Sequence, residues 1–523
     1  MIDAGAARHA PGRPGRPGGL TPLQRLLGWL LRMGLWALAL AIVVLPVGVA
    51  HYLLTDTDRL PSQIATAGSL ATASELAAWR SAGAALPANA APVVLCYHDI
   101  RPGSSDGYVV SPRLFERQLM ALGAAGYRTL TSQEYLAYLA GAPAGPRSVY
   151  LTFDDGTEGL YLYADQILAR QHMHGASYLI SGRVGTHRPY YLTWAEVTMM
   201  AGSGRWDFQA HTHDLHTRGP VGAGQTDGSL LTGRAWRPAD HRLETDAQHA
   251  ARVWQDISAQ LQDFQRHRLP RPQLFAYPFS DLGSNQDKGT VGATASFIDS
   301  TYRAAFTNEA STPAPTSRRS RAGGEIQRIE IFGDTSPVNL LVQVARWTAV
   351  APDGLSPLRD PDRWWDTWTR RVPPAGLFDG RTTKARYVQA SYAPFASADW
   401  IDYRVAANVE GLVDGENNAN ITVRVGGSSS LTLRVGYAGL QVVGPAGTLL
   451  RSPRLRPSAQ HCLRVDVADR ETLIVADGNR IATVHSAGGP RATGGLALAL
   501  RGDRDAVMPR LSGLTVSALA QSR

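Results

Sequence analysis

The sequence predicts a multidomain protein with an N-terminal transmembrane helix, a domain of alternating strands and helices, and a C-terminal antiparallel β-sandwich. Three observations predict it. Residues 33–50 carry no charged side chain, and the apolar run continues to about residue 54. Apolar strand-like runs then alternate with helical patterns as far as about residue 350. From about residue 384, apolar and polar residues alternate with the period of two that is typical of strands.

Length and composition agree with several domains. A chain of 523 residues is long enough for two or three domains, and its hydrophobic fraction of 44% is ordinary for a globular protein. The net charge is +8, but the arginines are spread along the chain without a nucleic-acid-binding motif. We therefore expect no nucleic-acid partner, and an anionic cell surface or acidic glycans instead. Cys96 and Cys462 are too few and too far apart for a disulfide framework, and each is predicted to be buried.

The N-terminus predicts where the protein acts. The uncharged run matches the roughly 20 residues that are needed to span a bilayer. The positive-inside rule then makes residues 1–32 a basic cytoplasmic tail, residues 33–54 an uncleaved membrane anchor, and the rest extracellular. The alternative is a signal peptide cleaved near Val49-Ala50, which would release the protein. The tail contains Asp3 as its one acidic residue and five arginines: Arg8, Arg13, Arg16, Arg25 and Arg32.

The next two segments differ in composition and in their predicted structure. Residues 55–91, rich in Ala, Ser and Pro, predict a stalk, and residues 92–350 predict the domain of alternating strands and helices. Within it, residues 219–240 form a polar, Gly-rich insertion that either shapes a binding groove or is mobile. Capping patterns place helix starts at Ser111, Thr131 and Thr193, and a longer helix is expected over about 243–266. The expected strands are Val93–Tyr97, Ser148–Phe153, Trp206–Ala210 and Gln327–Ile331.

The first candidate site residues follow a buried strand. The run Ser148-Val-Tyr-Leu-Thr-Phe153 brings Asp154 and Asp155 to its C-terminal end, where Gly156 permits a sharp turn. Adjacent residues leaving a strand point to different sides, so one carboxylate can bind a metal while the other handles protons. The alternative is an aspartate pair that caps the following helix. The histidines described next favour the metal site.

The second cluster is His211-Thr-His-Asp-Leu-His216, after the strand expected at Trp206–Ala210. Residues five apart lie roughly 140° apart on a helix, so His211 and His216 fit better on a loop. A borderline cation such as zinc accepts imidazole nitrogen and carboxylate oxygen, and a catalytic site leaves one position open for water. Asp155, His211 and His216 would make such a site. His213 is the alternative second histidine, because it would share one face of an extended strand with His211.

With these two motifs the sequence resembles the polysaccharide deacetylases of carbohydrate esterase family 4, most closely the poly-N-acetylglucosamine deacetylases of biofilm polysaccharide systems. The resemblance covers about residues 92–350. It implies a distorted (β/α) barrel that removes N-acetyl groups from a glycan with a divalent metal, zinc first and cobalt, nickel, manganese or iron as alternatives. Further segments that carry the resemblance are Val93–Ile100, Phe115–Leu119, Gly126-Tyr127 and Phe275–Phe279.

Chemistry and resemblance together assign the remaining roles. Asp154 would be the general base that takes the proton from water. The resemblance gives the backbone N–H of Phe279 to the oxyanion, since the preceding Pro278 has no N–H, and it makes Tyr277 and Pro278 substrate contacts.

The expected general acid, which would protonate the leaving amine, is His98 at the end of the first expected strand. Many family members carry this histidine in a late Leu-x-x-His motif, but here no histidine lies between His267 and His461. The resemblance implies that a Tyr-His near the start of the domain supplies the acid. A hydrogen-bonded histidine at a strand end is the alternative. Asp99 either orients His98 or serves the turn, and it receives no role.

Residues 351–383 are expected to be a linker, and residues 384–523 a β-sandwich. Asp477-Gly478 predicts a hairpin between two of its strands. The pattern resembles concanavalin A-like jelly rolls, which often bind glycans. Trp400, Tyr403 and Tyr437 are candidate stacking platforms, although burial in the core is the favoured interpretation for each. The expected strands are Ile421–Val425, Leu431–Val435, Leu463–Val467, Leu473–Val475, Ile481–Val484 and Leu496–Leu500.

Two functional classes follow. The preferred one is a membrane-anchored deacetylase acting on a polymer of N-acetylglucosamine, with peptidoglycan, chitin or acetylated xylan as alternative substrates. The other is a glycan-binding or assembly protein without activity. Both aspartates, both metal histidines and a candidate acid are present, which favours the enzyme. The expected partners are the polysaccharide and the membrane, with a glycan synthase or export protein as further candidates.

Overall fold

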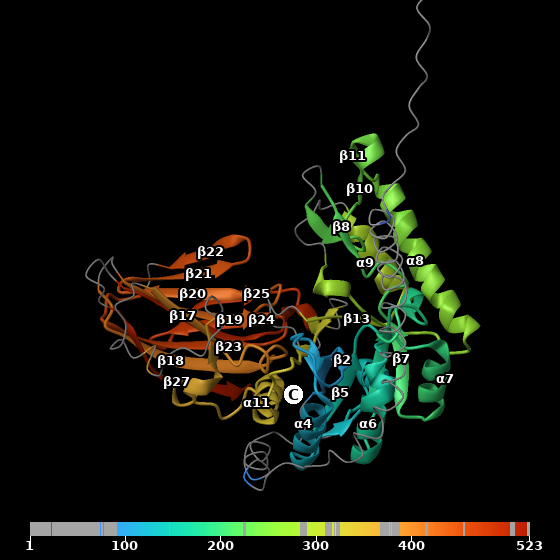
Figure 1. The fold of residues 1–523 in the computed structure, drawn as a ribbon. Helices are drawn as coiled ribbons and strands as arrows, with labels where there is room; N and C mark the ends of the chain where they lie inside the picture. The colour runs from blue at the N-terminus through green and yellow to red at the C-terminus, as the bar shows by residue number, and fades with distance from the viewer. Residues whose placement is uncertain are drawn as a thin grey trace, which may run out of the picture. The chain divides into compact units, whose positions relative to one another are not determined.

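The computed structural model describes two long stretches of the chain, residues 91–366 and 387–519 (Figure 1). Gaps fall at 146, 223–225, 283–289, 309–315, 318, 321–324, 414–416, 453–454 and 503–507, and residues 22, 74, 77, 376 and 378 are described singly. No helix among these residues is long and apolar enough to cross a membrane. The expected anchor, residues 33–54, lies outside them and stays a prediction.

The first domain is a parallel barrel that nearly closes. Its sheet runs in the order β14-β13-β12-β7-β6-β5-β1-β15, with β4 beside β5, and every pairing is parallel. β14 and β15 are consecutive in the chain yet stand at opposite ends of this order, so Arg328 between them links the two edges. The strands are β1 Val93–Tyr97, β4 Arg128–Thr129, β5 Ser148–Phe153, β6 Gly175–Leu179, β7 Trp206–Ala210, β12 Leu274–Ala276, β13 Ala304–Thr307, β14 Glu325–Gln327 and β15 Ile329–Glu330.

The barrel expectation is confirmed, with one strand corrected. The continuous strand expected at Gln327–Ile331 is broken at Arg328, because that residue leaves one edge of the sheet and β15 joins the other.

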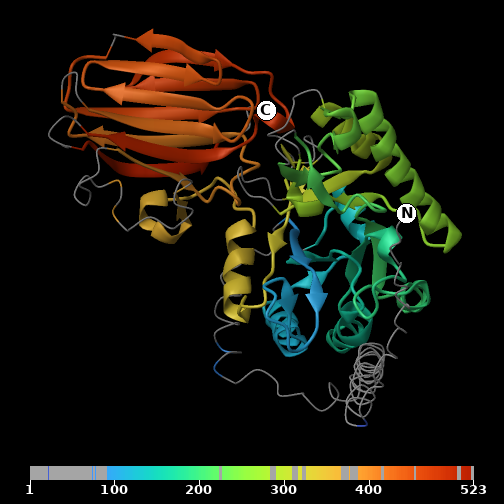
Figure 2. The same cartoon turned by 45° about the horizontal axis from the view of Figure 1, so that its top comes forward.

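Helices surround the strands, and their starts follow the capping patterns (Figures 1 and 2). Ser111 accepts a hydrogen bond from Leu114 N–H, while Thr131 and Thr193 open capping boxes. The longest helix begins at Asp246 rather than 243, because Thr245 caps it in a third capping box. The helices are α4 Pro112–Ala124, α5 Ser132–Leu139, α6 Asp165–Gln171, α7 Trp194–Gly202, α8 Asp246–Arg266, α9 Thr290–Thr301 and α11 Pro337–Trp347.

The insertion after the histidines is more ordered than its polar sequence suggests. Its described residues form two antiparallel pairs, β8 with β9 and β10 with β11. Arg252 of α8 binds Glu244 with an N–O distance of 2.7 Å and so fastens the end of the insertion. The four strands are β8 Arg218–Pro220, β9 Asp227–Ser229, β10 Trp236–Arg237 and β11 Arg242–Leu243.

The C-terminal region consists of two antiparallel sheets, in agreement with the alternating pattern (Figure 2). A seven-stranded sheet has the order β16-β17-β26-β19-β20-β21-β22, and a five-stranded sheet has the order β25-β24-β23-β18-β27. β16 lies within the stretch 351–383 that was expected to be a linker. The strands are β16 Trp364–Trp365, β17 Tyr387–Tyr392, β18 Tyr403–Glu410, β19 Asn418–Val425, β20 Leu431–Gly436, β21 Gly439–Gly444, β22 Gly447–Ser452, β23 Gln460–Val467, β24 Glu471–Ala476, β25 Asn479–His485, β26 Gly495–Arg501 and β27 Arg510–Ala518.

The aromatic residues of this region belong to its core. Trp400 and Tyr403 are buried in the apolar cluster, and Tyr437 packs against it partly buried. The favoured interpretation of core burial is confirmed for Trp400 and Tyr403. Cys96 is buried as expected, but the expectation for Cys462 is wrong because this side chain is exposed. The period of two explains the error, since buried Leu463 faces inward and its neighbour therefore faces out.

Candidate active site

A cavity of about 470 Å³ lies at the carboxyl ends of the barrel strands. Parallel strands bring the residues that follow them to one face of a barrel, where functional side chains gather. Six strands each supply a polar residue immediately after their last residue. These are His98 after β1, Asp154 after β5, His211 after β7, Tyr277 after β12, Asn308 after β13 and Arg328 after β14.

Asp155, His211 and His216 form a compact group of possible metal ligands. Their ligand atoms all lie within 4.8 Å of one another. Asp155 Oδ1 is 3.6 Å from His211 Nε2 and 3.4 Å from His216 Nε2. The same oxygen is buried and has no hydrogen-bond partner among the described residues. A buried carboxylate oxygen that faces two imidazole nitrogens fits a shared cation, so these residues fit the divalent metal that the sequence predicts.

Local structure orients these ligands. Asp155 has a φ of +70°, so the chain turns sharply directly after β5. The Nδ1 of His211 lies 2.8 Å from the Ala276 carbonyl oxygen and donates to it, which leaves Nε2 directed at Asp155. His213 instead contacts Asp263 Oδ2 at 2.8 Å through Nδ1. The structure therefore gathers His216, and not the alternative His213, with Asp155 and His211.

The electrostatics of His216 and Asp155 suit ligand binding, whereas the carboxylates of Asp154 and Asp155 outweigh burial and raise the pKa of His211. Burial and the neighbouring His211 lower the pKa of His216 to about 4, so its imidazole is neutral at pH 7. Burial would raise the pKa of Asp155, but the neighbouring His211 and the charge of His216 bring it below the usual value. Neutral imidazole and ionised carboxylate are the forms that bind a metal.

Asp154 is held by an arginine that sequence reasoning missed. Arg328 Nη1 donates to Asp154 Oδ1 at 2.8 Å, and Nη2 donates to Oδ2 at 2.6 Å. Both side chains are buried. Burial alone would raise the pKa of Asp154, but the charges of Arg328 and then His211 hold this pKa well below its usual range. The available signal was the position of this arginine within the expected strand Gln327–Ile331.

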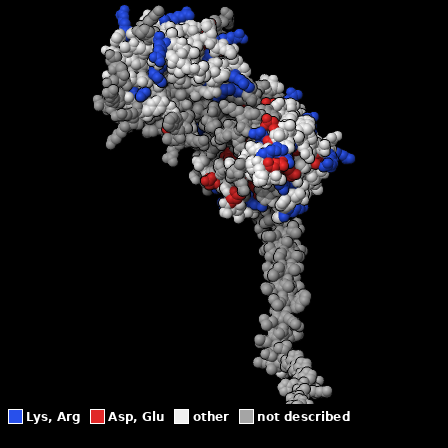
Figure 3. All heavy atoms as spheres, turned by 90° about the horizontal axis from the view of Figure 1, so that it is seen from above, with Lys and Arg blue, Asp and Glu red and all other residues white. Residues whose placement is uncertain are grey.

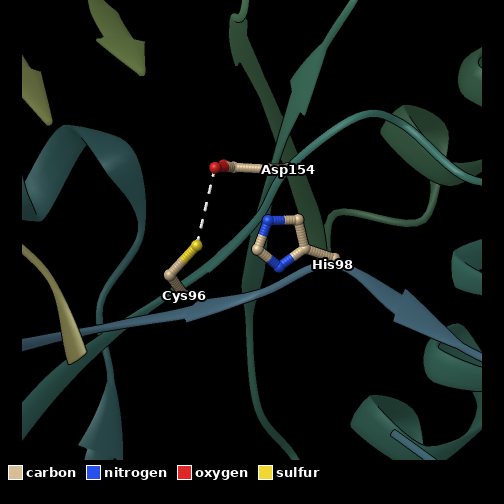
Figure 4. Close-up of side chains that lie close together, drawn as sticks. All are labelled: Cys96, His98 and Asp154. Atoms are coloured by element: carbon tan, nitrogen blue, oxygen red, sulfur yellow. Dashed lines mark hydrogen bonds between the residues drawn. The ribbon is translucent and has the colours of Figure 1, made fainter. Parts of the chain in front are cut away.

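Cys96 of β1, His98 directly after β1 and Asp154 directly after β5 lie close together (Figure 4). The Cys96 thiol lies 3.5 Å from Asp154 Oδ2. These three also offer ligand atoms within 4.8 Å of one another. However, burial raises the pKa of the thiol far above its ordinary value, and the Arg328 guanidinium occupies both oxygens of Asp154. This second group therefore suits a cation less well than the group around Asp155.

His98 lines the cavity, and two neighbours hold its ring. The ring packs edge-on against Tyr108 with 4.9 Å between the centroids. His98 Nε2 lies 3.9 Å from Glu330 Oε1. Asn308 Nδ2 donates to the same Glu330 oxygen at 2.9 Å and Asn308 Oδ1 accepts from Arg328 Nε at 2.8 Å. Contacts through Glu330 and Asn308 therefore connect His98, the candidate acid, to Arg328, which binds the candidate base Asp154.

Asp99, which received no role, has a structural one. It accepts a hydrogen bond from Thr157 Oγ1 at 2.8 Å and forms an ion pair with Arg101. Burial raises its pKa despite the charge of Arg101. Asp99 thus ties the segment after β1 to the segment after β5.

The expected substrate contacts differ in position. Tyr277 and Phe279 line the cavity, whereas Pro278 is buried and does not. Phe279 has a φ of +58°, and its ring lies 4.6 Å from the ring of His216. The guanidinium carbon of Arg218, from β8, lies over the Phe279 ring at 5.2 Å from its centroid. The side chain of Phe279, as well as its backbone, therefore belongs to the wall of the cavity.

Three exposed aromatic side chains surround the opening. Tyr108, Tyr190 and Phe279 line the cavity and keep 48%, 40% and 42% of their surface exposed. Arg101 lies over the Tyr190 ring at 5.3 Å. Exposed rings beside a polar cavity are suited to contacts with the apolar faces of sugar rings.

Comparison with known proteins identifies the segment that carries most of this site. Residues 141–294 match the polysaccharide deacetylase family. This segment of the chain therefore matches a polysaccharide deacetylase domain. The matched segment includes Asp154, Asp155, His211 and His216, whereas His98, Asn308, Arg328 and Glu330 lie outside it.

Individual relatives resemble part of the chain. The poly-beta-1,6-N-acetyl-D-glucosamine N-deacetylase of Staphylococcus epidermidis is 32% identical over 112 residues, and that of Staphylococcus aureus MSSA476 is 35% identical over 112 residues. Each alignment covers 21% of this chain and 39% of the relative. The chain thus matches less than half the length of these relatives. The solved structure of IcaB from Ammonifex degensii aligns with 49% of this chain and 97% of its own, at 24% identity and a TM-score of 0.37.

Proposed function

We propose that this protein is a metal-dependent hydrolase that removes N-acetyl groups from an extracellular polymer of N-acetylglucosamine, of the poly-N-acetylglucosamine type. The observation that carries the proposal is one cavity in which a ligand group, Asp155 with two histidines, lies beside a buried carboxylate, Asp154, and an accessible imidazole, His98. Hydrolysis of an amide needs a place for water, a base and an acid. The named relatives from Staphylococcus support the choice of polymer.

Asp155, His211 and His216 would hold the metal, with zinc as the first choice and cobalt, nickel, manganese or iron as alternatives. A bound divalent cation would lower the pKa of water and polarise the acyl oxygen. The protein fixes the geometry for this chemistry, because the Ala276 carbonyl orients His211 and the turn at Asp155 directs its carboxylate at both histidines.

Asp154 would act as the general base. Arg328 occupies one lone pair on each of its oxygens, which leaves further lone pairs to accept a proton from water. The low pKa makes Asp154 a weak base, so proton transfer depends on acidified water. Arg328 keeps the Asp154 carboxylate ionised and fixes the plane of this carboxylate. Arg328 is therefore a positioning residue.

His98 would protonate the departing amine as the general acid. Tyr108 and Glu330 hold its ring at the cavity wall. The backbone N–H of Phe279 would donate to the oxyanion. Tyr277, Phe279 and the exposed rings of Tyr108 and Tyr190 would contact the sugar.

We further propose that residues 33–54 anchor the enzyme in the cell membrane with the catalytic domain outside, where it would meet its polysaccharide and a synthase or export protein. The uncharged length of this run and the five preceding arginines support the proposal. Cleavage near Val49-Ala50 with secretion is the alternative. N-terminal sequencing of the protein recovered from cells distinguishes the two.

The test of the proposed function is acetate release by the purified full chain. Poly-N-acetylglucosamine, chitin oligomers, peptidoglycan and acetylated xylan would be compared with and without a chelator. We expect release from the N-acetylglucosamine polymer, loss with chelator, and recovery with zinc. Absence of release from all four polymers by metal-loaded protein would favour a glycan-binding protein instead.

A further inference from the structure

The outer face of the seven-stranded sheet carries a row of mostly polar residues. In an antiparallel sheet, directly opposed residues lie on the same face with their Cβ atoms about 5 Å apart. Strand register pairs the members of this row one after another from β17 to β22. The row is Gln389, Ala499, Asn420, Arg434, Gln441 and Arg451.

The row lies on the side of the sheet opposite the core, because its sequence neighbours face the core. Ala499 and Asn420 in the middle of the row are only 8% exposed, whereas Arg434 and Arg451 are exposed. Val388, Leu433 and Val442 alternate with row members and are buried in the apolar cluster. A shorter second row, Tyr387 opposite Arg501, continues the face. Polar contacts join neighbouring members, since Tyr387 OH donates to Gln389 Oε1 at 2.7 Å and Arg434 Nε donates to Asn420 Oδ1 at 3.3 Å.

The two sheets of the sandwich differ in charge. The strands of the seven-stranded sheet contain four arginines and no acidic residue, and only Arg424 is buried. The other three, Arg434, Arg451 and Arg501, are exposed and form no ion pair among the described residues. Figure 3 shows basic side chains with very few acidic ones on the visible surface of the sandwich, which is on the left as in Figure 1.

The five-stranded sheet neutralises its arginines instead. Its strands also contain four arginines, but three acidic residues accompany them. Arg404 binds Asp466 at 2.6 Å, and Arg510 forms an ion pair with Glu410. Uncompensated positive charge is therefore a property of one face of the sandwich and not of the whole domain.

We infer that the outer face of the seven-stranded sheet binds an acidic polysaccharide. Arginine matches a carboxylate with two parallel hydrogen bonds, and asparagine and glutamine both donate to and accept from sugar hydroxyls. The row crosses six strands, which is about 24 Å at the usual strand spacing, so it suits an extended polymer. Single-stranded nucleic acids need several stacking rings, but Tyr387 is the one exposed aromatic residue among the described side chains of these strands.

The test is binding of the purified full chain to polygalacturonate at physiological salt, with dextran as the neutral polymer. The variant Arg434→Gln/Arg451→Gln/Arg501→Gln removes three exposed charges from the proposed face. Arg464→Gln/Arg480→Gln/Arg510→Gln removes three exposed charges from the five-stranded sheet and is the matched control. Exposed ion pairs contribute little to stability, so both variants are expected to fold, and equal melting temperatures would verify this.

Wild type and control should bind polygalacturonate in preference to dextran, and the first variant should bind about tenfold more weakly or worse. Equal weakening in both variants would overturn the inference, since net charge would then explain binding. Preference for single-stranded DNA over polygalacturonate, lost in the first variant only, would overturn it in favour of a nucleic-acid surface. No deacetylation is measured in this assay, so its outcome is independent of the proposed enzymatic function.

Discussion

Two buried arginines, one in each domain, are stabilised in opposite ways. Arg328 in the barrel and Arg424 in the sandwich both expose only 1% of their surface. Arg328 binds the ionised carboxylate of Asp154 with two hydrogen bonds, whereas Arg424 donates to the Ser486 hydroxyl at 2.6 Å and to the Ala468 carbonyl.

The two environments change the arginine pKa in opposite directions. Burial opposes the charge of both, but Asp154 outweighs burial and raises the pKa of Arg328, while burial dominates and lowers the pKa of Arg424. In the sandwich, the buried charge of Arg424 therefore connects the segments of Ala468 and Ser486 through neutral hydrogen-bond acceptors. In the barrel, buried Arg328 keeps the carboxylate of Asp154 ionised at the wall of the cavity, where this charge is available for a reaction.

The largest effect is expected at the ligand group. Asp155→Ala, His211→Ala or His216→Ala should each abolish bound metal and activity, because two remaining ligands hold a cation poorly. Metal content by elemental analysis checks this. His213→Ala is the control, and it should keep its metal because His213 contacts Asp263. Full metal content in His216→Ala, with loss in His213→Ala, would show that the wrong histidine was chosen.

Replacing the two buried arginines tests the comparison directly. Arg328→Met should cost about 3–5 kcal/mol of unfolding free energy at neutral pH, because Asp154 is left as an unpaired buried charge. Arg424→Met should cost about 1–3 kcal/mol, because only neutral acceptors lose their donor. Deacetylation should fall strongly in Arg328→Met alone. Denaturant unfolding and acetate release measure both, and equal loss of activity in the two variants would remove the distinction.

The cost of Arg328→Met should also depend on pH. The folded-state pKa of Asp154 is depressed, so its ion pair stabilises the wild type above the ordinary aspartate pKa of about 3.9. That contribution is lost as the pH falls through the folded value. The stability difference between wild type and Arg328→Met should therefore shrink towards low pH, and a difference that grows on acidification would contradict the pairing.

His98→Ala should retain metal while hydrolysis of an N-acetyl substrate falls by roughly 10²–10⁴. An aryl acetate, whose leaving group needs no proton, should lose much less. Kinetics on the two substrates separate proton donation from a structural role. Equal losses on both would argue against His98 as the acid, and wild-type activity on the amide would exclude it.

The smallest effect is expected at the exposed rings. Tyr190→Ala should raise KM for a short N-acetylglucosamine oligomer several-fold with little change in kcat, since a stacking contact contributes about 0.5–1.5 kcal/mol. Trp254→Ala, at an exposed aromatic residue of α8 that does not line the cavity, is the control and should leave KM unchanged. A fall in kcat at constant KM in Tyr190→Ala would indicate a role in the reaction itself.

The sequence predicts the proposed metal ligands and the general base, but not the residues that position the base and the acid. Asp154, Asp155, His211 and His216 lie in two short motifs, so local pattern and ligand chemistry identify them. Arg328, Asn308 and Glu330 lie on or directly after the last barrel strands, and closure of the sheet brings them beside Asp154 and His98. No local pattern predicts which distant arginine meets a given carboxylate.

The sandwich was easier to predict because apolar and polar residues alternate along several of its strands, such as β18, β20 and β23. The same alternation would have placed Cys462 on the outer face, opposite Leu463, had it been applied to that position. The polar row across the seven-stranded sheet depends on strand order and register, which alternation within single strands does not contain.

The most direct test of the central claim compares wild type with Asp154→Asn, both loaded with zinc, for acetate release from poly-β-1,6-N-acetylglucosamine. Asparagine keeps the shape of the side chain but loses the charge that accepts a proton. We expect one zinc ion per chain in both proteins, and release by the wild type that falls by roughly 10²–10⁴ in the variant. Turnover by zinc-loaded Asp154→Asn at the wild-type rate would show that Asp154 is not the general base.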